Sequence, residues 1–315
     1  MRRLLIDSEV LSHAYVPQEL LFREEEKAKL LRALLNDVNT FIYGPSGSGK
    51  TALLKLTIEE FNSISKARAV YVDAVLCQTT NSILKEILSN LNPLSAIPRS
   101  NSYLVERLRR MGKRKVVCID HFEELRDVSI IDKLFGLGIT IILASNQRAS
   151  FKRLSKHAMS LIPNFLYLPK YTDEQVYRIL AERARRALSE GCCKSTIISS
   201  IAERSSGNVT LAISLLKACA ARAESENRRI VREPDIPNPI NEQKTRDDEQ
   251  ILLELMKERK RLPASKLYEL YVERAEKAKS ERTFREYMRR LRAKGLVRAI
   301  GEKRWRVYEF SGVKA

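Results

Sequence analysis

The sequence predicts an α/β protein with a parallel sheet and a P-loop, followed by a helical subdomain and a basic C-terminal module. Three observations support this order. Short apolar runs alternate with helical patterns in the first half, a Gly-rich loop separates the first run from a helix, and the pattern becomes purely helical after Pro169. Strands that alternate with helices are typical of parallel sheets.

Four apolar runs are predicted as the strands of this sheet. They lack polar alternation, as expected where helices cover both faces of a sheet. The runs are 40–43, 69–72, 115–119 and 140–144. We expect a helix over about 50–61, directly after the Gly-rich loop.

Beyond Tyr171, helical spacing predicts three helices, which form a small helical subdomain. Thr172 and Gln175 have the spacing of a capping box, so the first helix begins after Thr172. The expected ranges are 172–188, 194–204 and 209–224. Three prolines within 234–239 then predict a stiff, extended linker, because proline fixes φ and lacks an N–H donor.

The C-terminal module has the pattern of a winged helix-turn-helix, with three helices followed by a β-ribbon. Its helices are expected at 248–257, 264–277 and 282–294, and its strands at 296–300 and 304–308. The predicted domains are the α/β base 1–170, the helical subdomain 171–232, the linker 233–246 and the winged-helix module 247–315.

Composition favours a nucleic-acid partner. The 315 residues carry a formal net charge of +18 with 30% charged residues, and such an excess suits the neutralisation of phosphates. Five scattered cysteines without a Cys-x-x-Cys pair indicate reduced thiols rather than a zinc site or a disulfide framework. Apolar runs are too short for a membrane span or a signal peptide, so we expect no membrane partner and a cytoplasmic, nucleoid-associated location.

The Gly-rich loop matches the P-loop pattern and has the required strand before it and helix after it. Its glycines allow backbone N–H groups to surround phosphates at a helix N-terminus. Lys50 is expected to reach the β- and γ-phosphates, and the Thr51 hydroxyl to hold Mg²⁺. The loop predicts ATP or ADP binding through Gly44, Pro45, Ser46, Gly47, Ser48, Gly49, Lys50 and Thr51.

Polar residues at the ends of two predicted strands complete the expected site. Asp120 ends the third strand, where a Walker B carboxylate would hold Mg²⁺ together with Thr51. Asn146 follows the fourth strand and could contact the γ-phosphate or orient a water. Asp at a strand end and Asn in a turn are common in themselves, so both assignments depend on the P-loop.

Positive charge concentrates in the last predicted helix and ribbon. Arg282, Arg285 and Arg289 fall on the side opposite the apolar residues, as in a helix that enters the major groove. A merely solvated basic helix is the alternative. The ribbon adds cations suited to phosphates or the minor groove, at Lys303, Arg304 and Arg306.

Several ordered segments resemble the archaeal origin-recognition and cell-division-cycle initiator family of AAA+ ATPases. The likeness covers nearly the whole chain. It is carried by 15–17 with 22–25, 42–45, 71–74, the sensor 1 segment 144–146, 168–171, 182–184, the sensor 2 segment 206–216 and the predicted winged helix.

The resemblance implies that the base 1–170 binds nucleotide, that the helical subdomain 171–232 is a lid, and that the module 247–315 binds DNA. It implies ATP-dependent recognition of origin double-stranded DNA. It also implies recruitment of the minichromosome maintenance helicase and cooperation with other initiator paralogues. A second DNA contact in such proteins comes from helices inserted between Walker A and B, which would correspond to 79–99.

The sequence departs from this family at three catalytic positions. His121 stands where the family has a Glu after the Walker B Asp, Thr210 where it has the sensor 2 Arg, and His157 near the arginine finger that acts in trans. Glu123, with Glu124 beside it, is the carboxylate that we consider as a replacement for this missing Glu. We therefore expect nucleotide binding with slow or no hydrolysis. The alternatives are a DNA-binding regulator that does not hydrolyse ATP, or a P-loop ATPase of a transposition or signalling system.

Overall fold

The computed structural model describes residues 4–12, 14–92, 100–112, 114–237, 247–274, 280–293, 296–301 and 306–311. The chain forms two compact units, Met1–Pro237 and Asn238–Ala315. Each unit is described below by itself.

A five-stranded parallel sheet forms the centre of the first unit, in the order β2-β3-β4-β1-β5. All four predicted strands are present, and every residue of β3 and β4 is buried. The fifth strand was not predicted; its four residues lie at the edge of the sheet and alternate between half-buried and exposed. The strands are β1 (Thr40–Tyr43), β2 (Arg68–Asp73), β3 (Lys115–Asp120), β4 (Thr140–Ser145) and β5 (Asn164–Tyr167).

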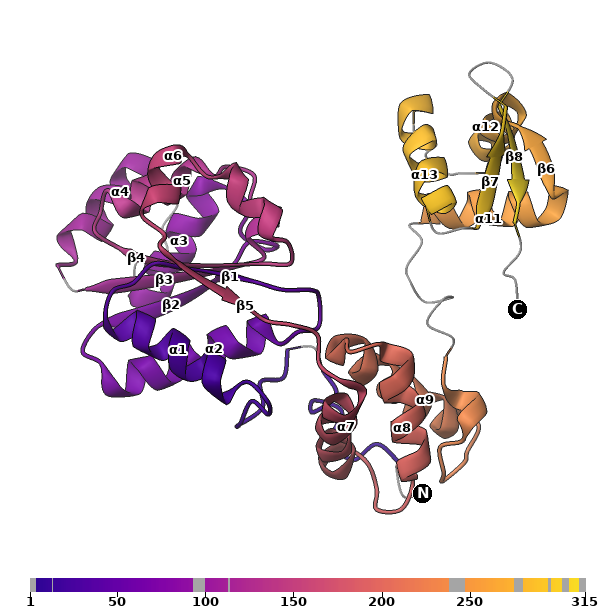
Figure 1. Cartoon of the computed structure of the whole chain (residues 1–315), viewed down its shortest axis with the longest axis horizontal. Helices are drawn as coiled ribbons and strands as arrows, with labels where there is room; N and C mark the ends of the chain where they lie inside the picture. The colour runs from indigo at the N-terminus through magenta and orange to yellow at the C-terminus, as the bar shows by residue number, and fades with distance from the viewer. Residues whose placement is uncertain are drawn as a thin grey trace. The chain divides into compact units, whose positions relative to one another are not determined.

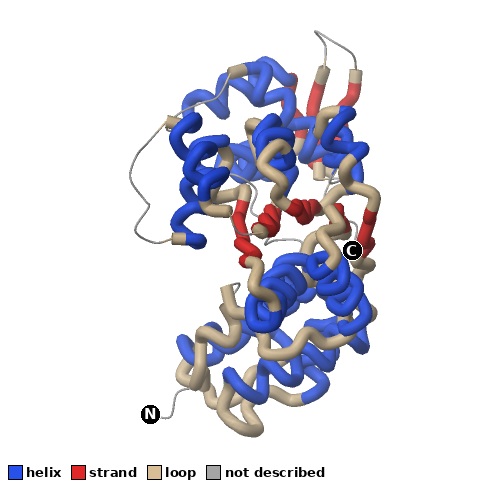
Figure 2. The backbone as a smooth tube through the Cα atoms, turned by 90° about the vertical axis from the view of Figure 1, so that its left-hand side faces the viewer, coloured by secondary structure: helices blue, strands red, loops and turns tan. Residues whose placement is uncertain are grey.

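Helices cover both faces of this sheet, which explains the uninterrupted apolar runs of the central strands. Figures 1 and 2 show the strands between the two groups of helices. One apolar core packs α1 (Glu24–Leu35) and α2 (Lys50–Ile64) against the sheet. A second core packs the other face against α3 (Thr80–Leu91), α4 (Asn101–Arg110), α5 (Ser129–Phe135) and α6 (Lys156–Ser160).

The lid consists of the three predicted helices, α7 (Asp173–Ala187), α8 (Ser195–Ser205) and α9 (Val209–Ser225). The predicted capping box is present, since Thr172 accepts from Gln175 N and Gln175 Oε1 accepts from Thr172 N. The N-terminal segment also joins the lid, which the sequence did not indicate.

This N-terminal strap, residues 4–12, packs into the lid core. Leu4, Val10 and Leu11 are buried there, and Leu5 pairs with Leu188 as an isolated β-bridge. Leu5 N also donates to Glu224 Oε1, 2.9 Å away, on α9. The lid core is therefore assembled from both ends of the first unit.

The expected extended linker is wrong at its start. Glu233–Asp235 form a 3₁₀ turn with Pro234 in its first turn, a position that needs no N–H donor. Asp235 is buried and accepts two hydrogen bonds from Arg228, at 2.6 and 2.8 Å. Burial of Ile236 in the lid core outweighs the extended preference of this proline-rich stretch. The remainder of the linker, 238–246, lies outside the described residues.

The second unit contains three helices and a three-stranded antiparallel sheet in the order β6-β8-β7. The helices and the two ribbon strands were predicted, whereas β6 was not. Assignment of this unit as a winged helix-turn-helix stays a prediction. The elements are α11 (Asp247–Arg259), β6 (Arg261–Pro263), α12 (Ala264–Arg274), α13 (Glu281–Ala293), β7 (Val297–Ile300) and β8 (Val307–Phe310) (Figure 1).

Candidate nucleotide site and its comparisons

The Gly-rich loop connects β1 to α2 in a conformation that requires its glycines. Gly47 has φ +76° and Gly49 φ +94°, both in the left-handed region that side chains disfavour. A Cβ on Gly44 would lie 2.2 Å from Leu168 O. The loop ends where α2 begins at Lys50, so its backbone N–H groups and the helix N-terminus form a cradle suited to phosphate.

Replacing Gly47 by Ala is expected to weaken nucleotide binding and lower the melting temperature. Its Cβ would lie 1.9 Å from Oδ1 of Asn208, the side chain that caps α9 by accepting from Leu211 N. Gly191→Ala is the matched control, because φ there is +73° and no atom lies within 4 Å of the added Cβ.

The control variant therefore bears only the backbone cost, about 1 kcal/mol. Calorimetric titration with ADP and thermal unfolding should separate the two variants. Equal losses in both would mean that the contact between Gly47 and Asn208 has no importance for the site.

Lys50 reaches back over the loop. Its Nζ donates to Gly44 O at 2.7 Å and to Pro45 O at 2.9 Å, and the residue is buried. Burial lowers the pKa of Lys50, while the charges of Asp120 and Glu123 act in the opposite direction. A desolvated ammonium beside backbone N–H groups is chemically suited to bind the oxygens of a polyphosphate.

Asp120 and Thr51 meet below the loop. Thr51 Oγ1 donates to Asp120 Oδ2 at 2.6 Å, and the Tyr71 hydroxyl donates to the same oxygen at 3.1 Å. Burial, followed by the charges of Asp120 and Asp73, raises the pKa of Tyr71, so this hydroxyl remains a neutral donor. A hydroxyl and a carboxylate are oxygen ligands of the kind that Mg²⁺ takes, so the residues present fit this ion.

His121 begins a turn that leads away from the sheet. It has φ +53°, and its Nδ1 lies 3.1 Å from Asp73 Oδ1 at the end of the neighbouring strand β2. Asp73 Oδ1 also accepts from Val75 N at 2.9 Å. The residue after the Walker B carboxylate is thus paired with a second carboxylate, which the sequence did not reveal.

Glu123 and Asn146 bind one another across the ends of β3 and β4. Asn146 Nδ2 donates to Glu123 Oε1 at 2.6 Å, and Asn146 N lies 3.2 and 3.3 Å from the two carboxylate oxygens. Both oxygens of Glu123 are therefore engaged in holding Asn146. This geometry suits a positioning residue better than the water-activating carboxylate that the sequence allowed.

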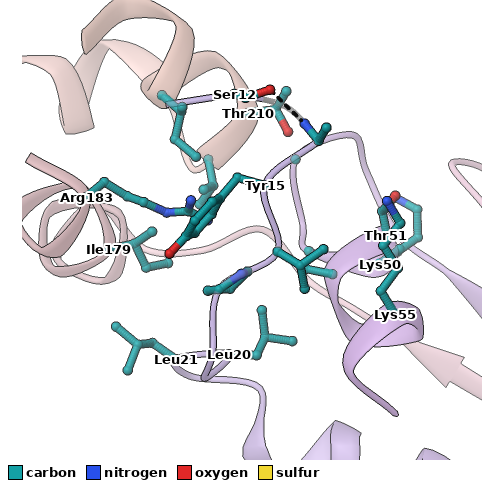
Figure 3. Close-up of a pocket in the computed structure, with 18 of the residues that line it drawn as sticks. Ser12, Tyr15, Leu20, Leu21, Lys50, Thr51, Lys55, Ile179, Arg183 and Thr210 are labelled. Atoms are coloured by element: carbon teal, nitrogen blue, oxygen red, sulfur yellow. Dashed lines mark hydrogen bonds between the residues drawn. The ribbon is translucent and has the colours of Figure 1, made fainter. Parts of the chain in front are cut away.

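A cavity of about 700 Å³ lies beside the loop and extends toward the lid. Figure 3 shows Lys50 and Thr51 on one side of it and Tyr15, Ile179 and Arg183 on the other. The Arg183 guanidinium lies 4.2 Å from the centre of the Tyr15 ring and donates to Val10 O at 2.8 Å. Both residues lie in segments that carry the family resemblance, but neither was predicted to line the site, because their contact joins segments far apart in the chain.

Two family descriptions match the chain. The AAA domain matches residues 35–150, and the Cdc6 AAA+ ATPase-type lid domain matches residues 177–239. ORC1-type DNA replication protein 9 of Halobacterium salinarum is 26% identical over 97% of this chain and 93% of its own length. The chain is a divergent relative of the archaeal ORC1/Cdc6-type AAA+ proteins.

Other relatives agree with this assignment. ORC1-type DNA replication protein 1 of Archaeoglobus fulgidus is 27% identical over 75% of this chain, and the match spans 65% of that protein. The Aeropyrum pernix ORC1 structure in complex with DNA has a TM-score of 0.79 at 20% identity, covering 99% of this chain and 94% of that one. The structure of Cdc6p from Pyrobaculum aerophilum has a TM-score of 0.66 at 22% identity, and the match covers 98% of this chain and 94% of that one. At these identities the two structures show a common fold.

In this ORC1/Cdc6 relative the lid contacts the P-loop directly. Val209 N, at the start of α9, donates to Gly47 O at 3.3 Å. Thr210 lines the cavity, as expected for the sensor 2 position, but it carries no charge. The cations that line the cavity from the lid are Arg183 and Arg186, within the part of the lid that the structure describes.

The region of the expected trans finger lies on the surface. His157 is exposed on α6, and no contact in the described residues tests its role. Arg153 is nearby in sequence, but its guanidinium donates to the carbonyls of Phe122 and Glu123, at 3.1 and 2.6 Å. The role of His157 therefore stays a prediction.

The expected DNA contacts lie in the second unit. Arg282, Arg285 and Arg289 are all exposed on α13, and Arg285 forms a 2.9 Å ion pair with Glu281. Arg306 is half-buried, and its Nε is enclosed and has no hydrogen-bond partner among the described residues. Lys303 and Arg304 lie outside the described residues. So do residues 93–99 of the segment 79–99, which was expected to provide a second DNA contact. The apolar side of α13 packs as expected, through Phe284, Tyr287, Met288 and Leu291.

No helix within the described ranges is long and apolar enough to span a membrane.

Proposed function

We propose that this chain is an ATP-dependent DNA-binding protein that acts as a replication initiator. It would recognise origin-like double-stranded DNA through the second unit and help to recruit the minichromosome maintenance helicase, alone or with initiator paralogues. Its site of action would be the chromosome in the cytoplasm. The curated relatives are named as DNA replication proteins, which supports this proposal.

The contact between α9 and the P-loop is the observation that carries the proposal. Val209 donates to Gly47 O, and Asn208 lies against the same glycine. A nucleotide bound at the P-loop therefore acts on the residues that hold the lid. The lid in turn holds the root of the linker through Arg228 and Asp235, so the second unit is tethered to the part that responds to nucleotide.

Hydrolysis is expected to be slow in this protein. His121 is paired with Asp73, and the carboxylate of Glu123 is occupied by Asn146. Thr210 offers no cation to developing charge on the γ-phosphate, and stabilisation of this kind contributes strongly to phosphoryl transfer. Bound ATP with Mg²⁺ would then act as a long-lived switch, held by Thr51, Asp120 and Lys50.

The test combines turnover with DNA affinity for the full chain. Phosphate release should stay close to background, and duplex affinity should differ between ATP and ADP. Robust turnover that disappears in Lys50→Ala would overturn the slow-hydrolysis proposal. Duplex affinity that is identical with ATP, with ADP and without nucleotide would overturn the switch.

A DNA-binding regulator that does not hydrolyse ATP is the second candidate, favoured by His121 and Thr210. Genome-wide occupancy of the tagged protein distinguishes the two. Sharp peaks at replication start sites are expected for an initiator. Peaks at promoters would favour the regulator, and peaks at mobile elements would favour an ATPase of a transposition system.

A further inference from the structure

Aromatic side chains are exposed along the edge of the sheet, away from the nucleotide cavity. β5 is the edge strand, and its outward residues Phe165 and Tyr167 are 39% and 53% exposed. The ring centres of Tyr43 and Tyr167 lie 5.1 Å apart, with an angle of 35° between the ring planes. The Arg148 guanidinium lies 5.6 Å from the Tyr43 ring and 5.7 Å from the Phe165 ring. These four residues are called the β5 platform.

Positive charge follows Arg148 along the chain without an intervening carboxylate. Residues 147–163 include four cations and no Asp or Glu. Arg148 forms no ion pair with any carboxylate among the described residues, and Lys152 and Lys156 are exposed. The surface thus combines flat apolar rings with cations, rather than offering apolar area alone.

This combination selects a polyanion that carries flat rings. Bases of nucleic acids stack on exposed aromatic rings and on guanidinium planes, while Lys and Arg hold the phosphates. In a duplex the faces of the bases are covered by their neighbours, so only an unpaired strand can use such a surface. A second copy of this chain is disfavoured as the occupant, because its net charge of +18 has the same sign as the cations of this surface. The second unit of the chain is disfavoured for the same reason, since it has 21 Lys and Arg against 13 Asp and Glu.

We propose that the β5 platform binds single-stranded nucleic acid by stacking unpaired bases on Tyr167, Phe165 and Tyr43. Arg148 supplies a further plane for stacking, and Lys152 and Lys156 contact phosphates. None of the four platform residues lines the nucleotide cavity. The platform is therefore a second nucleic-acid site, separate from the duplex contacts expected on α13.

The experiment compares two strands that carry the same number of phosphates. Fluorescence anisotropy of the full chain is measured with a short oligothymidylate and with a strand of equal length made of abasic spacers. The wild type should bind the strand with bases at least about fivefold more tightly, the effect expected for one stacked base. Tyr167→Ala should remove most of this difference, and Arg148→Gln should reduce it.

Tyr103→Ala is the matched control, because Tyr103 on α4 is another exposed tyrosine, 43% exposed, whose hydroxyl accepts a hydrogen bond from Arg107. It should leave the base-dependent difference unchanged. Thermal unfolding checks that each variant is folded. Duplex affinity is measured in parallel, and it should fall in a variant with both Arg282→Ala and Arg289→Ala, whereas the base-dependent difference should remain.

Three outcomes would overturn the proposal. These are equal affinity of the wild type for both strands, a full base-dependent difference in Tyr167→Ala, and a loss of this difference in Tyr103→Ala as large as in Tyr167→Ala. If the platform variants instead reduce the mass measured by light scattering, the surface is a contact between protein copies. A wild-type protein that binds no duplex but still prefers the strand with bases would overturn the proposed function and leave the platform intact.

Discussion

A variant that combines Asp73→Asn with His121→Glu is expected to hydrolyse ATP about a hundredfold faster than the wild type, the lower range of what a positioned base contributes. The substitution at 121 places a carboxylate after Asp120, where the resembled family has one. The substitution at 73 removes the negative charge that now lies 3.1 Å from the side chain of residue 121. Steady-state release of phosphate is the measurement.

The two substitutions together are expected to raise the rate of hydrolysis more than either one alone. Glu at 121 alone would face the Asp73 carboxylate, and like charges at this distance disfavour each other, so the single variant should gain much less. Asn at 73 keeps an oxygen that can accept from Val75 N, so the turn after β2 should remain intact. Adding Lys50→Ala to the double variant should abolish the gain. A double variant that stays at the background rate would show that the defect lies elsewhere, with Thr210 the next candidate.

Removing Arg282 and Arg289 together is expected to lower duplex affinity about tenfold or more, and to reduce the slope of log K against log salt by about 2. Both side chains are exposed on α13, and neither has an ion-pair partner among the described residues. Each one that contacts a phosphate releases about one counterion, so the salt slope counts the contacts directly. Anisotropy titrations over a range of salt concentrations provide this slope.

The control removes the same charge from another helix of the same unit. Lys266→Ala with Arg274→Ala takes two exposed cations from α12, where each is paired with a Glu. Such surface pairs contribute little to stability, so the fold should hold. Equal losses from the α12 and α13 variants would mean that net charge alone, rather than the face of α13, drives binding.

Local patterns were enough to predict the P-loop, the capped lid helix and the buried strands. In each of these, neighbouring residues alone determine the structure, as with Thr172 and Gln175. β5 was not predicted, although its run of Phe165, Leu166 and Tyr167 is as apolar as that of β1, because local pattern alone does not distinguish so short an edge strand from a loop. The linker was misread because tertiary contacts of Asp235 and Ile236 outweigh the local preference of the prolines.

The functional pairs depend on sheet order, which the sequence does not state. Asp73 lies beside Asp120 only because β2 neighbours β3 in this register. The same holds for Glu123 and Asn146, which meet because β3 neighbours β4. A single sequence identifies the strand ends as candidate positions, but it does not say which of their side chains will bind one another.

The N-terminal strap has a consequence for the order in which the first unit folds. Leu5 N donates to Glu224 Oε1 across 219 positions of the chain, and Leu4 is buried among lid residues. During synthesis the sheet can complete itself once β5 has emerged, whereas the strap meets its first partners only when α7 follows and its last only when α9 follows. Closure of so long a loop is slow compared with the local pairing of neighbouring helices. The strap is thus made before the sheet but buried after it, and it remains open to proteases and chaperones until the lid is complete.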